Sequence, residues 1–228
     1  MDMSRATGAI QRFGEGTGDL LLEAVDKGVN TRWEPARERA AKAAGATLPA
    51  RVAEVRKMFA QELGLVGAGT GGAGAVPGVG TAAVLATAAG DIAWTTVRLA
   101  DLVLTIAHLH GHDKADVEER RMWVLAVLAG GATATRFAEK LATEAGKGLG
   151  AKATAAVSTQ MIQQFNRAMG RTIVTKYGTK RGAVALGKAL PFGIGALIGG
   201  GFNYGTVRVV SRTADRFFAL LPGLAQPN

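Results

Sequence analysis

Residues 81–110 read TAAVLATAAGDIAWTTVRLADLVLTIAHLH, and this stretch decides the fold of the chain. Small and aliphatic side chains cover most of its faces, and Asp91, Arg98 and Asp101 are its only acidic or basic groups before the histidines at its end. A helix that is apolar on most sides is typically buried. Gly111 follows at once and is the kind of residue that ends a helix. The pattern therefore predicts a long core helix from Thr81 to His110.

The region before this helix predicts two amphipathic helices. Leucine and valine recur at helical spacing from about residues 17–19 to 28–30, with charged side chains between them. A second, very polar helix with Pro35 in its first turn is expected to end near Ala44. Arg37, Arg39 and Lys42 are expected to make this second helix face solvent.

Residues 47–64, TLPARVAEVRKMFAQELG, predict a third helix. Thr47 is expected to cap it and Gly64 to end it. Its single apolar stripe is formed by Val52, Val55, Phe59 and Leu63. The helix is expected to bury this one stripe.

The rest of the chain also predicts helices. Asp113 is expected to cap a helix that runs to the Gly130-Gly131 pair, and further helices are expected over 133–149 and 152–177. Residues 182–220 predict an apolar helix, a glycine cluster and a last helix bearing Arg208, Arg212 and Arg216. The predicted fold is all-α with little or no strand, a single domain over 1–228. Amphipathic helices occupy 1–63 and a glycine-rich helical core occupies 64–228.

Two long runs lack any charged residue, 63–90 and 189–207, and both contain proline and many glycines. Glycines four residues apart, as at Gly67 and Gly71 or Gly195 and Gly199, let helix backbones approach closely. Proline and glycine argue against ordinary membrane spans. The runs fit either buried helices or half-inserted hairpins shielded by the rest of the protein.

Composition excludes some chemistry and favours an anionic partner. The chain has no cysteine, which removes disulfides, thiolate metal sites and cysteine nucleophiles. From Arg136 onward thirteen basic residues stand against Glu139, Glu144 and Asp215. Few aromatic residues lie among these cations, so nucleic acid is not expected, and the surface meets either anionic lipid or only solvent. The residues predicted to face a membrane surface are Arg167, Arg171, Lys176, Lys180, Arg181 and Lys188.

Three motifs that resemble cofactor or metal sites are better explained by packing. Gly67, Gly69 and Gly72 match G-x-G-x-x-G, but further glycines and Pro77 interrupt the helix that a dinucleotide site needs. Residues 182–188, GAVALGK, lack the serine or threonine that would reach magnesium in a phosphate-binding loop. His108, His110 and His112 cluster where the core helix ends, which favours capping over metal binding. No cofactor, metal or catalytic residue is predicted.

Arg98 and Asp101 lie one helical turn apart in an apolar helix. They form either an internal salt bridge or a polar anchor for the headgroup of a ligand in an apolar pocket. The predicted ligand or lipid site comprises Pro77, Val79, Asp91, Trp94, Arg98, Asp101, Pro191, Phe192, Phe202, Asn203 and Tyr204.

Two blocks of the chain resemble the EcsC family of bacterial proteins. The first is GAGTGGAGAVPGVGTAAVLATAAGDIAWTTVRLADLVLTIAHLHGHD, and the second is KALPFGIGALIGGGFNYGTVRVVSRTADRFF. The second carries a pattern similar to that family's closing motif, here Pro191, Gly195, Ala196, Gly199, Gly200, Gly201 and Asn203. The resemblance implies a helical, hydrophobic, membrane-associated protein, in one known setting encoded beside an ABC transporter. It brings no established activity or catalytic residue.

These observations favour a non-enzymatic protein that binds an anionic membrane surface or an apolar ligand. The N-terminus shows no secretory signal, so the expected location is cytoplasmic and peripheral, at the inner face of the membrane. The alternative is a scaffold that binds a transporter or another protein of a membrane complex. The third hypothesis is a lipid-directed hydrolase with Asp91 or a histidine as base, although the chain lacks a nucleophile elbow.

Overall fold

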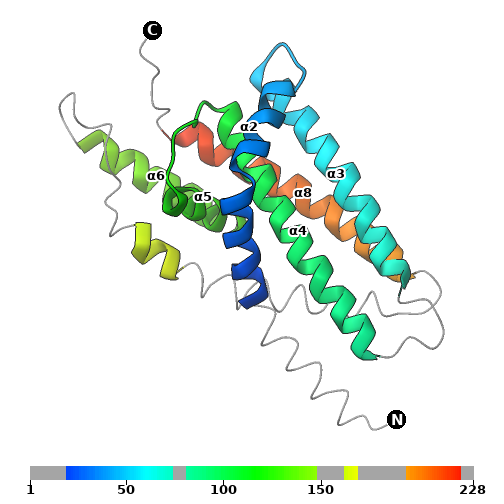
Figure 1. Cartoon of the computed structure of the whole chain (residues 1–228). Helices are drawn as coiled ribbons and strands as arrows, with labels where there is room; N and C mark the ends of the chain where they lie inside the picture. Colours follow the sequence, from blue (N-terminus) through cyan, green and yellow to red (C-terminus); the bar gives the residue numbers. More distant parts are fainter. Residues whose placement is uncertain (1–18, 74–80, 148–161, 169–193, 222–228) are drawn as a thin grey trace.

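The computed structural model describes residues 19–73, 81–147, 162–168 and 194–221, and most of these residues are helical, with no strand among them (Figure 1). This confirms the predicted all-α fold. The helices are residues 19–31, α2 (Trp33–Lys42), α3 (Leu48–Ala73), α4 (Thr81–Leu109), α5 (Val117–Ala129), α6 (Gly131–Lys147), residues 162–168 and α8 (Ile194–Leu220).

Helix α4 forms the centre of the fold, as the sequence predicts. It contacts α2, α3, α5 and α8, and every residue from Arg98 to Leu109 is buried. Among the described residues one stretch, Ala89–Leu109, is long and apolar enough to cross a membrane, but 83% of it is buried inside the protein. Burial by other helices on this scale is typical of a core helix.

Helix α4 ends where the sequence predicts, and Gly111 is the reason. Gly111 adopts a φ of +83°, which is costly for a residue with a side chain. The Gly111 N–H donates to the His108 carbonyl and the His112 N–H donates to the Ala107 carbonyl, each at 3.0 Å. This pair of bonds is the Schellman motif, which satisfies carbonyls that the end of a helix leaves open.

Helix α3 does not end at Gly64, so that prediction is wrong. It continues through the glycine-rich residues to Ala73 and packs along α8, the most extensive contact between two helices in the described part of the chain. Figure 1 shows the two running side by side in opposite directions. The same correction applies to α8, which is a single helix across its glycine cluster. Tertiary packing outweighs the low helix propensity of glycine in both helices.

Two further details differ from the sequence-based predictions. Asp116, not Asp113, caps α5, because its carboxylate accepts the Glu119 N–H at 2.8 Å. Arg39 does not face solvent, because it turns from α2 towards α4 and its side chain is only 23% exposed. Asp113 and Asp116 are both residues that can cap a helix, so local sequence does not choose between them. The direction of the Arg39 side chain is likewise decided by its contact with α4.

Candidate functional site

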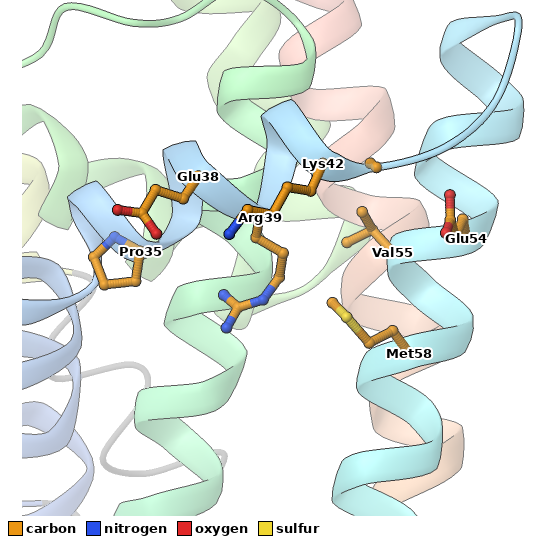
Figure 2. Close-up of a pocket in the computed structure, with 8 residues that line it drawn as sticks. Pro35, Glu38, Arg39, Lys42, Glu54, Val55 and Met58 are labelled. Carbon is orange, nitrogen blue, oxygen red and sulfur yellow. The ribbon is translucent and has the colours of Figure 1, made fainter.

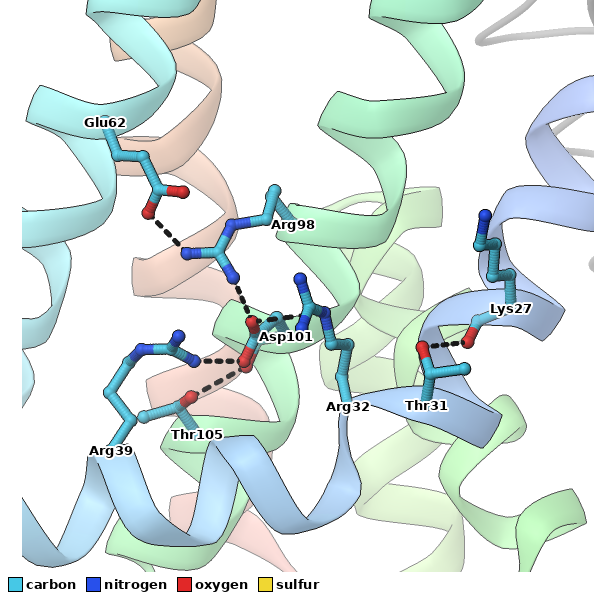
Figure 3. Close-up of polar contacts among 8 residues, drawn as sticks. All are labelled: Lys27, Thr31, Arg32, Arg39, Glu62, Arg98, Asp101 and Thr105. Atoms are coloured by element: carbon cyan, nitrogen blue, oxygen red, sulfur yellow. Dashed lines mark hydrogen bonds and ion pairs between the residues drawn. The ribbon is translucent and has the colours of Figure 1, made fainter.

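Asp101 is the centre of a buried ionic cluster (Figure 3). Its side chain is 0% exposed, and its carboxylate accepts from Arg39 Nη1 at 2.5 Å and from Arg98 Nη1. Arg32 Nε lies 3.7 Å from the same carboxylate. Arg98 also binds Glu62 of α3. The i, i+3 pair predicted from the sequence is therefore present, within a larger network.

The side chains of this cluster come from three layers of the fold. Arg98 and Asp101 lie on α4 and Glu62 lies on α3. Arg32 is the N-cap residue of α2, and Arg39 lies in its last turn. The Phe59 ring of α3 lies 5.1 Å from the Arg39 guanidinium and 4.9 Å from that of Arg98. These cation–π contacts and the charge pairs join α2, α3 and α4 at one point.

The charges of the cluster do not balance. Three guanidinium groups face two carboxylates, so an excess positive charge remains when both carboxylates are ionised. Burial raises the pKa of Asp101 above its usual value, although Arg39, Arg98 and Arg32 each act to lower it. An ionised Asp101 is the counter-charge that the buried Arg98 and the partly exposed Arg32 and Arg39 share, and an unpaired buried charge is costly.

A groove of about 330 Å³ opens beside the cluster, between α2 and α3 (Figure 2). Arg51 positions these helices, because its guanidinium donates to the Ala40 and Ala43 carbonyls at the end of α2 at 2.7 and 3.2 Å. Arg39 belongs to both the groove and the cluster. Its lining combines charges of both signs with apolar side chains, a composition that suits a small amphipathic molecule. The groove is lined by Pro35, Glu38, Arg39, Lys42, Ala43, Glu54, Val55 and Met58.

The predicted ligand site is only partly assembled among the described residues. Asn203 is buried and its Nδ2 donates to the Leu63 carbonyl at 3.1 Å, one residue from Glu62, so it lies near the cluster. Asp91 is 7% exposed and Trp94 packs against the core, both earlier on α4. Tyr204 instead points outward and is 54% exposed. Phe202 belongs to α8, whereas Pro77, Val79, Pro191 and Phe192 lie outside the described residues.

Sequence reasoning missed Arg32, Arg39, Glu62 and the groove. Their positions follow from long-range packing of α2 and α3 on α4, for which the chain carries no local motif. One local feature could have pointed to Arg39. It lies three residues after Ala36, which is buried against the core, so the two share the inward face of α2.

Of the six basic residues predicted to face a membrane, the structure describes one. Arg167 is exposed on the helix 162–168. Arg171, Lys176, Lys180, Arg181 and Lys188 lie outside the described residues.

Helix α8 carries an exposed cationic stripe, which we call the α8 row. Its members are spaced four residues apart and all are exposed: Tyr204, Arg208, Arg212, Arg216 and Leu220. Successive members are neighbours one turn apart on the helix surface, and at 3.6 residues per turn the three arginines lie within about 80° of the helix circumference. Within the described part of the chain no ion pair involves the three arginines. Val209, which is 60% exposed, lies beside the row.

The two charge-free runs of the sequence meet at one end of the fold. The last part of α3 and the first parts of α4 and α8 lie together at the lower right of Figure 1. We call this region the charge-free end, and it consists of residues 63–73, 81–90 and 194–207. Leu65 within it is 75% exposed, the largest exposure among the bulky apolar residues described.

Among the described residues no group of three or more histidine or acidic side chains is placed to hold a metal ion. The chain matches no family model, no curated protein and no solved structure. The resemblance to the EcsC family stays a prediction that rests on the two quoted blocks.

Proposed function

We propose that the protein binds peripherally to anionic membranes, with its charge-free end entering one leaflet and the α8 row contacting the lipid headgroups. The observation that carries this proposal is that the described parts of two charge-free runs, far apart in the sequence, lie at one end of the fold. Arg208 follows directly on α8, and within the described residues no ion pair involves it. A segment without charged residues that is followed by cations is typical of proteins that lie in the membrane interface.

The dimensions of the charge-free end fit one leaflet. Glu62, Asp91 and Arg208 are the first charged residues reached from this end along α3, α4 and α8. At 1.5 Å of rise per residue they stand roughly 16, 15 and 21 Å from the helix ends. Each leaflet contributes about 15 Å of hydrocarbon. Glu62 is paired with Arg98, so an acidic side chain at this depth is already neutralised.

The α8 row supplies the electrostatic part of binding. Arg208 and Arg216 are separated by two turns, roughly 12 Å along the helix. Each cation held near an anionic bilayer contributes about 1 kcal/mol, and this contribution falls off within a Debye length, so Arg208 contributes most and Arg216 least. Tyr204 lies at the boundary between the row and the charge-free end, where an aromatic ring with a polar tip is favoured.

Flotation with vesicles tests the electrostatic part. The full chain is mixed with phosphatidylcholine vesicles with or without phosphatidylglycerol, at low and high salt. We expect flotation that requires the anionic lipid and weakens at high salt. Replacing Arg208, Arg212 and Arg216 together by Gln should reduce the bound fraction strongly. The matched control replaces three exposed lysines elsewhere on the fold by Gln, and so changes the net charge by the same amount; these are Lys27, Lys57 and Lys114.

A second pair of variants tests the apolar part. Leu65→Glu places a charge in the charge-free end and should weaken binding that survives high salt. Leu48→Glu, at the opposite end of α3, should leave binding unchanged. A chain that stays unbound with every vesicle would contradict the proposal and favour the scaffold hypothesis, in which these faces bind a protein.

A further inference from the structure

Three histidines lie where α4 meets α8, and each makes a different contact. His108 Nδ1 lies 2.9 Å from Asp113 Oδ1, and its ring packs 4.1 Å from the Trp33 ring. His110 Nε2 lies 2.9 Å from Asp215 Oδ1 of α8. His112 is the exception, because no carboxylate among the described residues binds its ring.

The His112 ring is enclosed by aromatic side chains. It is 5% exposed and lies 5.5 Å from the Trp123 ring of α5 and 5.2 Å from the Phe218 ring of α8. Trp123 and Phe218 also meet each other edge to face at 5.3 Å. The ring hydrogen-bonds to the Phe218 backbone, while its Nε2 is buried without a hydrogen-bond partner. His112 therefore joins the C-terminal ends of α4 and α8 to the middle of α5.

The charged groups around His112 do not supply an acceptor for a second ring proton. The charges that act on it are those of His108 and His110 on α4 and of Asp113 in the following turn. His108 occupies the Asp113 carboxylate, and His110 occupies Asp215, the acidic residue that α8 brings to this cluster. From α5, Trp123 faces the ring directly, and Arg120 packs on Trp33 at 4.5 Å.

We propose that His112 is a pH-sensitive latch on the C-terminal turns of α8. Protonation of its ring at mildly acidic pH releases Phe217 and Phe218 from the aromatic cluster. At neutral pH both phenylalanines are almost fully buried, at 1% and 2% exposure. A protonated ring carries a second N–H, at Nε2, which has no partner in this site. A buried unpaired charge is expelled or the contact opens.

The pKa of His112 is lowered below 6.5, and burial of the ring is the largest cause, as expected for a ring that is neutral while α8 is docked. The folded form with α8 docked therefore binds fewer protons than the released form, and docking weakens as pH falls below 6.5. Released phenylalanines beside Arg212 and Arg216 would strengthen interfacial binding, a consequence that rests on the membrane function proposed above.

Hydrogen exchange of the full chain tests the latch directly. Exchange into a peptide covering residues 210–221 is measured at pH 7.5 and 5.5, with times corrected for the intrinsic rate. We expect protection to fall by about tenfold or more at pH 5.5. His112→Asn keeps a donor for the Phe218 backbone without titrating, so its protection should be equal at both pH values. His110→Gln is the control and should retain the wild-type fall, because His112 still titrates.

Equal protection at both pH values in the wild-type protein would overturn the latch. So would an undiminished fall in His112→Asn. If that variant does not fold, a ring-proton titration of the wild type decides: a His112 pKa below 6.5, with Phe218 signals that shift at the same pH, supports the latch. A His112 that titrates at or above 6.5 without moving Phe218 overturns it.

Flotation at the two pH values separates the two proposals. With phosphatidylglycerol vesicles, stronger binding at pH 5.5 in wild type but not in His112→Asn supports the latch as a regulator. Loss of protection at pH 5.5 without any flotation would refute the membrane function and leave the latch standing. Flotation together with equal protection at the two pH values would refute the latch and leave the membrane function standing.

Discussion

Arg98 of α4 binds the carboxylate of Asp101, which lies one turn further along the same helix, and both side chains are buried. The pair belongs to a network that Arg32, Arg39 and Glu62 complete from three other positions in the chain. Asp101 is the one acceptor that three arginines share, so its ionised form holds α2 against α4.

Replacing Asp101 by Asn should destabilise the fold. The change leaves three buried or half-buried arginines with Glu62 as their remaining counter-charge, and breaking a buried pair from one side costs about 3–5 kcal/mol. Urea unfolding followed by circular dichroism measures the loss. Glu34→Gln removes the exposed pair between Glu34 and Arg37 and should cost less than about 1 kcal/mol. Equal losses in the two variants would show that the buried network contributes no more than a surface pair.

Two glycine substitutions should act in opposite directions. A Cβ added at Gly28 would lie 2.6 Å from the Ala100 Cβ of α4, so Gly28→Ala should force the first helix away and cost about 1–3 kcal/mol. Gly64 has no heavy atom within 4 Å of an added Cβ and lies inside α3. Gly64→Ala should therefore raise the free energy of unfolding by about 0.5–1 kcal/mol.

Thermal or urea unfolding of these two variants also tests where α3 ends. If the helix ended at Gly64, as its sequence suggests, alanine there would bring no helical gain. A destabilised Gly64→Ala variant would contradict the continuous helix.

Removing the cap of α5 should lower stability moderately. Asp116→Ala loses the acceptor for the Glu119 N–H and should cost about 1 kcal/mol. Asp116→Asn keeps an acceptor and should restore most of this loss in the same unfolding assay. If Asp116→Ala matched wild type, Asp116 would not be the cap.

Stability should also depend on pH through His112. Its pKa is lowered in the folded state by burial, so the unfolded chain binds more protons near pH 6. The stabilisation is therefore complete above pH 6.5 and is lost as pH falls through the folded pKa. Urea midpoints measured from pH 7.5 to 5.0 should fall more steeply for wild type than for His112→Asn. Parallel curves would assign the pH dependence to other groups.

The sequence by itself determined the features that depend on near neighbours. The apolar run from Thr81 to Leu109 implied a core helix, and Gly111 implied its end, because burial pattern and the left-handed conformation are both local properties. The spacing of Arg98 and Asp101 similarly implied a pair. The four-residue spacing from Tyr204 to Leu220 is also visible in the sequence, but the sequence does not show which face of helix α8 is exposed.

Only the tertiary structure decided how distant segments combine. Gly64 is a sound helix end by propensity, but packing against α8 carries α3 on to Ala73. Arg39 belongs to a polar helix, but the buried carboxylate of Asp101 draws it inward. The charge-free runs were visible in the sequence, whereas their meeting at one end of the fold was not. Helix propensity acts within a few residues, and the free energy that brings α2, α3, α4 and α8 together comes from contacts between residues far apart in the chain.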